Sequence, residues 1–405
     1  MPEISFTNVL LWAIPLVPFA AFILIAVFSF RNRKASHTVA LTGAGFSFIA
    51  SMVVLWKALH IQNLAKAPLS SQVNWLPVAD TWFVFGLQVD PLTVVTLAFV
   101  AVTILMIFIY SVGYHNFGSP VGEDDLPGLP PKGALINHEG HSHRVPSVEP
   151  MYSRFFAFIS LFAFAMFLLV LSDNLLGLYI GWEIMGLCSY LLIGFWYGKE
   201  SARKAAIKAF ITTRIGDVFM LLGLAALYSL TGTLNYQQIL GNPAVLNTLA
   251  TTASPISGLS WAGLVGLLLF AGTIGKSAQF PLYVWLPDAM EGPTPVSAMI
   301  HAATMVSAGV YLVSRFFPLI SAGDNKNKCD KHQTVHFWVA RIQVAPKGDQ
   351  VDIGGIKHQF NTDQGADQMF ACEHAKQSDQ HQGCSQNKIP AQGDHFRSSF
   401  FSAAT

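Results

Sequence analysis

Residues 174–196 read NLLGLYIGWEIMGLCSYLLIGFW, and residues 260–284 read SWAGLVGLLLFAGTIGKSAQFPLYV. Each run supplies the roughly 20 mainly apolar residues that a helix needs to cross a bilayer. Each also holds one charged side chain, Glu183 in the first run and Lys276 in the second. A charge at this depth costs roughly 2.5–3.5 kcal/mol on insertion scales, so it needs a polar partner, water or another chain beside it. The two runs predict a membrane protein with a polar site between its helices.

The composition of the whole chain supports this prediction. Charged residues make up 12% of the 405 residues, hydrophobic residues 52%, and the formal net charge is +1. Soluble domains carry about 25% charged residues. The composition therefore excludes a soluble enzyme, a disordered protein and a protein that binds nucleic acid through its charge. The four cysteines are too few for a disulfide scaffold and form no haem or iron–sulfur motif, so we expect no cofactor in this chain.

We predict an all-α polytopic membrane fold of eight helices with a broken seventh helix. The seventh is rich in glycine and reaches Pro281, which removes a helical hydrogen bond, so the helix should break beside Lys276. Loosened backbone at membrane depth survives only where protein or a wet cavity surrounds it. The predicted spans are 8–30, 39–60, 90–112, 153–172, 174–196, 210–230, 260–284 and 294–318.

The positions of lysine and arginine predict the orientation. These residues gather in the loops at 31–38, 113–152 and 197–209, whereas residues 231–258 contain none. Positive loops stay in the cytoplasm, so the N-terminus should face outward. The stretch at 61–89, with its Pro, Gly and Trp residues, should then form an ordered hairpin or loop on the outer side.

The chain divides into four predicted regions. Residues 1–112 hold helices one to three with an outer loop, 113–152 form a flexible cytoplasmic loop rich in Gly, Pro and His, and 153–320 hold helices four to eight. Residues 321–405 form a polar, irregular tail, either an appended soluble domain or, as we favour, a frameshifted or misjoined reading of a truncated gene. Two groups are weighed as metal sites: His138 with His141 and His143, and Cys372 with His374, His381 and Cys384. We interpret the first as a solvated cluster in a loop, and the spacing of the second matches no common zinc framework.

The charges inside the spans are the candidate functional residues. Glu183 and Lys276 each lack an opposite charge within their own span, which favours a functional role. Arg214 and Asp217 stand three apart on one helical face, so they form either a structural ion pair or part of the site. His301, by itself, is more typical of a satisfied core histidine. Together they form an inventory of groups able to pass protons.

Three stretches carry a resemblance to a known family. They are LVLSDNLLGLYIGWEIMGLCSYLLIGFW (169–196), AAIKAFITTRIGDVF (205–219) and GKSAQFPLYVWLPDAMEGPTPVSAMIHAATMVSAGVYLVSR (275–315). They resemble subunit L of bacterial NADH–quinone oxidoreductase, respiratory complex I, which is its largest antiporter-like membrane subunit. The resemblance covers about residues 8–320. Family members continue for about eight more helices with a second repeat, so the resemblance implies a C-terminally truncated chain.

The resemblance assigns a role to each candidate residue. Glu183 matches a fifth-helix glutamate of the proton-translocation machinery, and Lys276 matches the central protonatable lysine of the broken helix. His301 matches an eighth-helix histidine that continues the polar path, and Asp217, with Arg214 beside it, matches a sixth-helix aspartate near the glutamate.

The resemblance also implies the setting of the chain. It implies a multi-pass protein of the bacterial inner membrane, in contact with lipid and with other membrane subunits of complex I. Quinone is reached only through the complex, flavin and iron–sulfur clusters lie in other subunits, and no nucleic acid is bound. Two alternatives stay open: the large subunit of a multisubunit cation/proton antiporter, and a fragment without activity.

Overall fold

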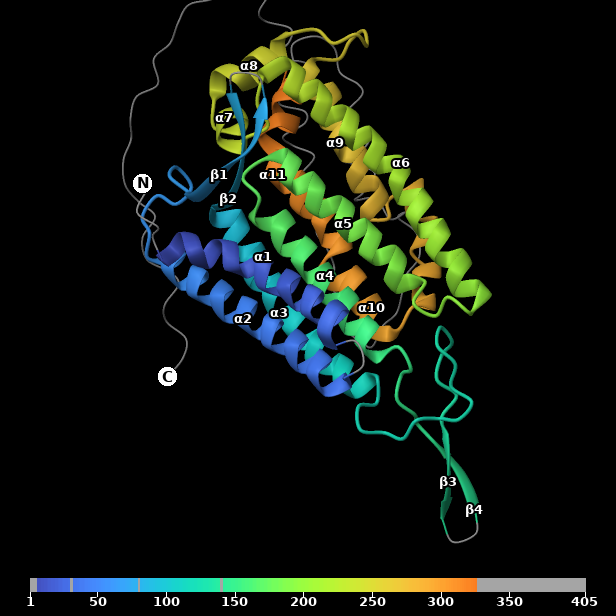
Figure 1. Cartoon of the computed structure of the whole chain (residues 1–405). Coiled ribbons are helices and arrows are strands. Elements are labelled where there is room, and N and C mark those ends of the chain that lie inside the picture. The colour runs from blue at the N-terminus through green and yellow to red at the C-terminus, as the bar shows by residue number, and fades with distance from the viewer. Residues whose placement is uncertain (1–5, 30–31, 79–80, 139–140, 326–405) are drawn as a thin grey trace, which may run out of the picture. The chain divides into compact units, whose positions relative to one another are not determined.

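The fold of the chain is a bundle of long apolar helices, seen here in a computed structural model (Figure 1). The structure describes residues 6–29, 32–78, 81–138 and 141–325. The proposed tail at 321–405, with its candidate cysteine and histidine ligands, therefore lies outside the described residues except for its first five positions.

The first helices form one side of the bundle. Helix α1 (Phe6–Leu24) ends in a π-helical turn, η1 (Ile25–Ser29), and packs on α2 (Arg33–Leu59) and α4 (Tyr152–Leu171). Helix α3 (Pro91–Tyr114) packs on α2. Helix α4 forms the core, because 78% of its span is buried against 39% for α2 and for α3.

The remaining long helices pack in sequence from α4 outward. Helix α5 (Leu175–Ile193) packs on α4 and on α6 (Glu200–Thr231), and α6 packs on α9 (Trp261–Lys276). Helix α11 (Met305–Asn325) lies against α9. The polar residues that the sequence singled out are carried by α5, α6, α9 and the segment before α11.

Short elements lie at the two ends of the bundle. Strands β1 (Leu69–Val78) and β2 (Thr81–Val89) form an antiparallel hairpin, which confirms the ordered hairpin predicted there. Helices α7 (Tyr236–Leu240) and α8 (Pro243–Thr251) lie at the same end, which we call the β1–β2 end (Figure 1). The opposite end, the β3–β4 end, carries the hairpin of β3 (Ala134–His138) and β4 (His141–Val145).

The broken seventh helix is confirmed, although it ends earlier than the predicted limit of residue 284. Helix α9 stops at Lys276, and the chain continues through two 3₁₀ turns, η2 (Leu282–Trp285) and η3 (Asp288–Glu291). Ala278 adopts a φ of 50°, a left-handed conformation that ends a helix. Within the described residues, seven helices are long and apolar enough to span a membrane, and α9 is the shorter apolar helix beside them.

The eighth predicted span is also interrupted, which the sequence did not predict. It consists of α10 (Thr294–Ala298), a π-helical turn η4 (Met299–Ala303) and then α11. Thr304 leaves helical geometry with φ −139° and ψ −79°. Its hydroxyl donates to the carbonyl of Met299 at 2.8 Å and so replaces a backbone donor at the break.

The segment at 113–152, predicted as a flexible loop, contains the β3–β4 hairpin and is hydrogen-bonded both within itself and to the turn after α5. Asn116 Nδ2 donates to the carbonyl of Ser147 at 3.1 Å, and the amide of Gly198 donates to the carbonyl of Gly128 at 2.8 Å. The rings of His141 and His143 lie 6.4 Å apart, and the side chain of His138 is outside the described part.

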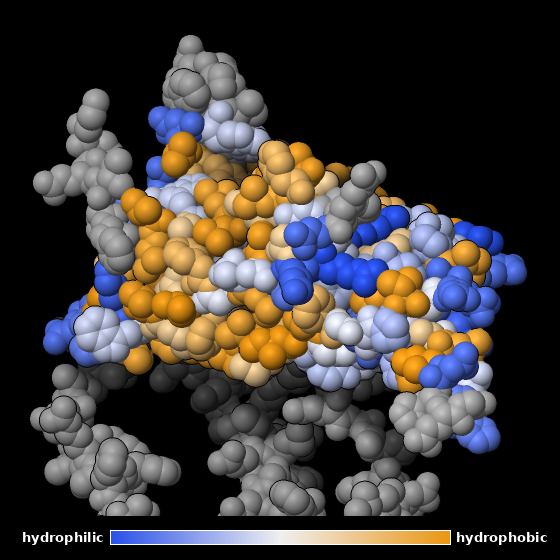
Figure 2. All heavy atoms as spheres, turned by 60° about the horizontal axis from the view of Figure 1, so that its bottom comes forward, coloured by the Kyte–Doolittle hydropathy of each residue, from blue (hydrophilic) through white to orange (hydrophobic). Residues whose placement is uncertain are grey.

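Large apolar side chains remain exposed along the helix faces that point away from the bundle. On α3 they recur every three to four residues and form one stripe: Val95, Phe99, Val102, Met106 and Ile109. Figure 2 shows such side chains spread broadly over one face of the molecule, with hydrophilic side chains gathered in part of it. Exposed apolar surface of this extent marks contact with lipid or protein. The chain is a multi-pass membrane protein.

Candidate functional site

The structure brings four of the five candidate residues into one line of charges. Glu183 on α5 is paired with Arg214 on α6, and Arg214 Nη1 lies 3.9 Å from Asp217 Oδ2. Lys276 Nζ, at the end of α9, lies 3.3 Å from the same Asp217 oxygen. Negative and positive side chains therefore alternate along this line of charges, in the order Glu183, Arg214, Asp217 and Lys276. Lys276 is thus paired with Asp217, and Glu183 with Arg214.

The two ends of this line differ in burial. The side chains of Lys276 and Asp217 are 0% and 1% exposed, whereas those of Glu183 and Arg214 are 22% and 28% exposed. A buried ion pair is costly to form and more costly to break, because removing one partner leaves a charge without compensation. Protonation or movement of either group at the buried end changes the energy of the other strongly.

Close helix packing creates the pocket for Lys276. An added Cβ at Gly216 of α6 would lie 2.5 Å from the carbonyl of Ala271, so only glycine lets α6 and α9 approach this closely. An added Cβ at Gly186 of α5 would lie 2.5 Å from Lys276 Nζ. The absent side chain of Gly186 is thus the space that the lysine head group occupies.

Trp182 forms the wall of the pocket. Its indole N–H donates to Asp217 Oδ1 at 2.5 Å, and Lys276 Nζ lies 5.9 Å from the centre of its ring. Asp217 is thus held by an indole donor on one oxygen and faces two cations with the other. The site fixes the carboxylate in place while Lys276 and Arg214 approach the same atom.

His301 lies in the π-helical turn η4 and is joined to the helix break through Trp285. The two rings are stacked, 6.4 Å apart and inclined by 20°. Trp285 Nε1 donates to the carbonyl of Gly275 at 2.9 Å, directly before Lys276. Among the described residues His301 Nε2 is buried without a hydrogen-bond partner. A buried polar atom of this kind is commonly satisfied by ordered water.

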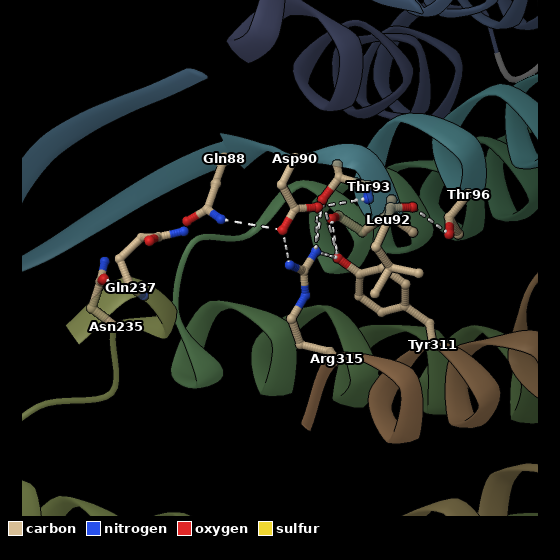
Figure 3. A network of polar contacts seen from close by, with 10 residues as sticks. Gln88, Asp90, Leu92, Thr93, Thr96, Asn235, Gln237, Tyr311 and Arg315 are labelled. Atoms are coloured by element: carbon tan, nitrogen blue, oxygen red, sulfur yellow. Dashed lines mark hydrogen bonds and ion pairs between the residues drawn. The ribbon is translucent and has the colours of Figure 1, made fainter. Parts of the chain in front are cut away.

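Two further charges, Asp90 and Arg315, were missed by the sequence reasoning. Asp90 caps the N-terminus of α3, and Arg315 of α11 makes a two-pronged ion pair with it (Figure 3). Arg315 also donates to Thr93 Oγ1 at 2.7 Å and to the hydroxyl of Tyr311 at 2.6 Å. The signal was present, because Arg315 is a charge within an apolar run, the criterion that identified Lys276.

A third polar cluster lies at the β3–β4 end, outside the spanning helices. His115, the C-cap of α3, is 2% exposed, and burial lowers its pKa to about 3. Glu149 is 1% exposed, and burial raises its pKa, an effect that the hydrogen bond from Trp196 only partly offsets. These groups titrate outside their usual ranges because the protein excludes water from them.

Two family models match the chain. The model described as "NADH:quinone oxidoreductase/Mrp antiporter, TM" matches residues 172–340, and so reaches into the polar stretch after Asn325. The model described as "NADH-Ubiquinone oxidoreductase (complex I), chain 5 N-terminus" matches residues 75–115. Together they include α3, all four residues of the charge line, His301 and Arg315.

Curated relatives agree with these models. NAD(P)H-quinone oxidoreductase subunit 5, chloroplastic, of Nephroselmis olivacea is 39% identical over 317 residues, which are 76% of this chain and 43% of the relative. NADH-quinone oxidoreductase subunit L of Neisseria meningitidis is 39% identical over 312 residues, which are 76% of this chain and 41% of the relative. The chain thus spans about two fifths of the length of these relatives.

A solved structure shares the fold. The Mrp complex from Dietzia sp. DQ12-45-1b superposes with a TM-score of 0.58 at 24% identity, over 78% of this chain and 29% of the matched chain. The likeness establishes the antiporter-like arrangement of helices. From the family models and the relatives, we conclude that the chain belongs to the family of antiporter-like membrane subunits of NADH–quinone oxidoreductases, the family of subunit L and subunit 5.

Proposed function

We propose that this chain translocates protons as a membrane module of an NADH–quinone oxidoreductase, with Lys276 as the group that takes up and releases the proton. The observation that carries the proposal is the ion pair of Lys276 with Asp217, which is buried at a helix break within the membrane. Lysine is well suited to such a role because burial disfavours its charged form and a nearby carboxylate restores it.

The line of charges supplies a means of release. Asp217 Oδ2 is shared between Lys276 at 3.3 Å and Arg214 at 3.9 Å. If Arg214 leaves Glu183 and moves onto Asp217, the attraction that holds the lysine charged is divided between two cations. Lys276 then gives up its proton toward water at the break, and His301, which stacks on Trp285 beside the break, is the candidate to continue the path. Reversing the movement recharges the lysine.

The setting of the chain is part of the same proposal. Lysine and arginine in the loops support a cytoplasmic β3–β4 end and an N-terminus facing outward in a bacterial inner membrane. The names of the relatives support other subunits of the oxidoreductase as partners. We propose that flavin and iron–sulfur clusters lie in those subunits and that quinone is reached only through the complex.

The test is a count of protons pumped per NADH oxidised, in membranes that contain the complex with this chain. Lys276→Met should abolish most of the pumping while the helices stay inserted, because it removes the titrating group and keeps the length of the side chain. Glu183→Gln should reduce pumping nearly as much as Lys276→Met, and Glu183→Asp should reduce it less. Lys204→Met is a matched control, because that lysine is exposed on α6. An unchanged ratio in Lys276→Met would make Lys276 a structural residue.

A cation/proton antiporter subunit is the second candidate function. The fold shared with the Mrp complex and the wording of the family model, which names both groups, favour it as the alternative. Both functions need the Lys276–Asp217 pair, so mutation of the pair does not separate them. Sodium-dependent proton exchange in vesicles without NADH would support the antiporter, and proton pumping that requires NADH would support the oxidoreductase.

A further inference from the structure

The pair of Asp90 and Arg315 lies at the β1–β2 end of the bundle, away from the charge line. Asp90 directly follows strand β2, and Arg315 lies about three turns beyond the break at Thr304 along α11. The side chain of Arg315 is 6% exposed and that of Asp90 is 14% exposed. This is a second buried ion pair within the membrane part, and the proposed proton path does not use it.

The surroundings of Arg315 hold its charge in a fixed position. The guanidinium bonds to Asp90, Thr93 and Tyr311 (Figure 3). Its central carbon lies 5.1 Å from the ring centre of Tyr236 and 5.2 Å from that of Tyr311. The hydroxyl of Tyr311 in turn donates to the carbonyl of Val170 on α4 at 2.7 Å. Helices α3, α4 and α11 are therefore joined through the side chains of Arg315 and Tyr311.

The charge of Arg315 is permanent. A guanidinium does not lose its proton in proteins, so Arg315 is unable to pass a proton on. Asp90 accepts the two-pronged ion pair from Arg315, and its Oδ1 also accepts a hydrogen bond from the amide of Thr93 at 2.9 Å, bonds that favour the charged carboxylate. Asp90 thus stays ionised as the counter-ion and is unavailable as a proton acceptor.

Helix α11 connects this pair to the lysine site. Ser277 Oγ donates to the carbonyl of Val306 at 2.7 Å, and Thr273 Oγ1 donates to that of Gly309 at 3.3 Å. These two bonds flank Lys276 and fix α9 on α11, so the seam between the two helices runs from the lysine toward the β1–β2 end. Arg315 lies beside this seam on another face of α11, against Asp90, Thr93 and Tyr236. Near the β1–β2 end of the seam, two buried polar atoms, Arg315 Nε and the hydroxyl of Tyr236, have no hydrogen-bond partner among the described residues. Such atoms are sites for buried water.

A wet seam from Lys276 to the β1–β2 end would let a proton escape on that side. We propose that Arg315, held in place by Asp90, is a fixed positive charge that closes the β1–β2 end of the module to protons. A proton that reaches this end approaches the like charge of Arg315, and the repulsion between the two charges is strong because the local dielectric constant is low. The inference rests on the proposed role of Lys276 as the proton carrier.

The test measures passive proton flux into vesicles that contain the full chain. A pH step is applied across the vesicle membrane, with the potential clamped by potassium and valinomycin, and a trapped dye reports the internal pH. Arg315→Met removes the charge and keeps an apolar side chain of similar length. We expect it to raise the flux about tenfold or more, a factor equal to about 1.4 kcal/mol of barrier. Arg315→Lys keeps a positive charge at this position, so its passive proton flux should stay at the wild-type level.

Two further variants separate the charge from packing and from general damage. Asp90→Asn removes the counter-ion but leaves the positive charge of Arg315. Its passive proton flux should therefore stay at the wild-type level, although the variant breaks the same ion pair. The double variant Arg315→Met with Lys276→Met should lose the leak, because the proton path then lacks its carrier. An unchanged flux in Arg315→Met, an equal leak in Asp90→Asn, or a leak that persists in the double variant would each overturn the inference.

The outcome is separable from that of the pumping experiment. The flux assay uses no NADH and no other subunit, whereas the pumping assay requires the whole complex. Loss of pumping in Lys276→Met, together with an unchanged passive proton flux in Arg315→Met, would support the proposed function and contradict the proposed role of Arg315. Unchanged pumping in Lys276→Met would remove the proposed function, whatever the flux of the Arg315 variants.

Discussion

Lys276 Nζ lies 3.3 Å from Asp217 Oδ2, and both side chains are buried within the membrane part of the chain. Neither group has a second fully buried ion partner in the part of the chain that the structure describes, since Arg214 is 28% exposed and 3.9 Å from Asp217. The two charges therefore depend on each other for compensation. This dependence gives the first prediction.

Asp217→Asn should destabilise the protein by about 3–5 kcal/mol, because it leaves Lys276 buried without its counter-ion. Unfolding of the purified protein in detergent measures the change. The double variant Asp217→Asn with Lys276→Met should be much less destabilised than the sum of the two single variants, because it removes both charges. Lys204→Ala, which breaks an exposed pair with Glu200, should cost about 1 kcal/mol or less. Additive effects at Asp217 and Lys276 would contradict the pairing.

Gly186→Ala should lower the melting temperature, because the new methyl group would lie 2.5 Å from Lys276 Nζ and push the lysine away from Asp217. Gly45→Ala on α2 is the matched control. An added Cβ there meets nothing within 4 Å, so it should raise stability by about 0.5–1 kcal/mol through helix propensity alone. Both melting curves are measured in the same detergent. A similar rise for both variants would show that the lysine does not fill the space at Gly186.

His115 should make the protein acid-sensitive. Burial lowers the pKa of His115 from its ordinary value of 6.5 to about 3, so between these values the unfolded chain binds the proton and the folded chain does not. The free energy of unfolding therefore has its full value, as far as His115 is concerned, above pH 6.5. It falls as the pH drops from 6.5 toward 3, with a slope of up to about 1.4 kcal/mol per pH unit.

His115→Phe removes this titration and keeps the aromatic contact with Phe155, whose ring lies 4.0 Å from that of His115. Melting temperatures at about pH 5 and about pH 7 should differ less in the variant than in the wild type. Glu149 titrates in both proteins, so the difference between them isolates His115. Equal acid sensitivity in the two proteins would assign the effect to another group.

The proposed orientation predicts which exposed positions react from outside the cell. In a background without the four native cysteines, Asn247→Cys on α8 should react with an impermeant maleimide, and Lys204→Cys on α6 should react only after the membrane is opened. The reason is the lysine and arginine excess in the loops of the β3–β4 end. The reverse labelling pattern would invert the orientation.

Hydropathy predicted the membrane fold well because the length of an apolar run is set by the bilayer. The third and fourth spans, predicted at 90–112 and 153–172, end within two residues of α3 and α4. The sixth was predicted at 210–230, but α6 begins ten residues earlier at Glu200. The additional turns of α6 carry the exposed residues Lys204 and Lys208. A hydropathy criterion ends the predicted span where such charged residues begin, although the helix itself continues.

The charged members of the site could be found by sequence, but their pairing could not. Glu183 and Lys276 stand out as charges in apolar runs, whereas the partner of each depends on how α5, α6 and α9 pack. The packing is set by glycines such as Gly216, whose role appears only when two helices are placed in contact. The π turn at His301 was missed for a related reason, because a threonine hydroxyl that accompanies the break leaves no mark in a hydropathy profile.

The early end of α9 also has an electrical consequence. The aligned peptide dipoles of a helix give its C-terminus a negative potential equivalent to about half an elementary charge. Because α9 ends at Lys276 and not at residue 284, this potential acts on the ammonium group within the membrane. No proton is able to neutralise it, whereas Asp217 loses its charge when protonated. Lys276 thus has one constant source of attraction and one variable source, and only the variable source needs to change for the proton to leave.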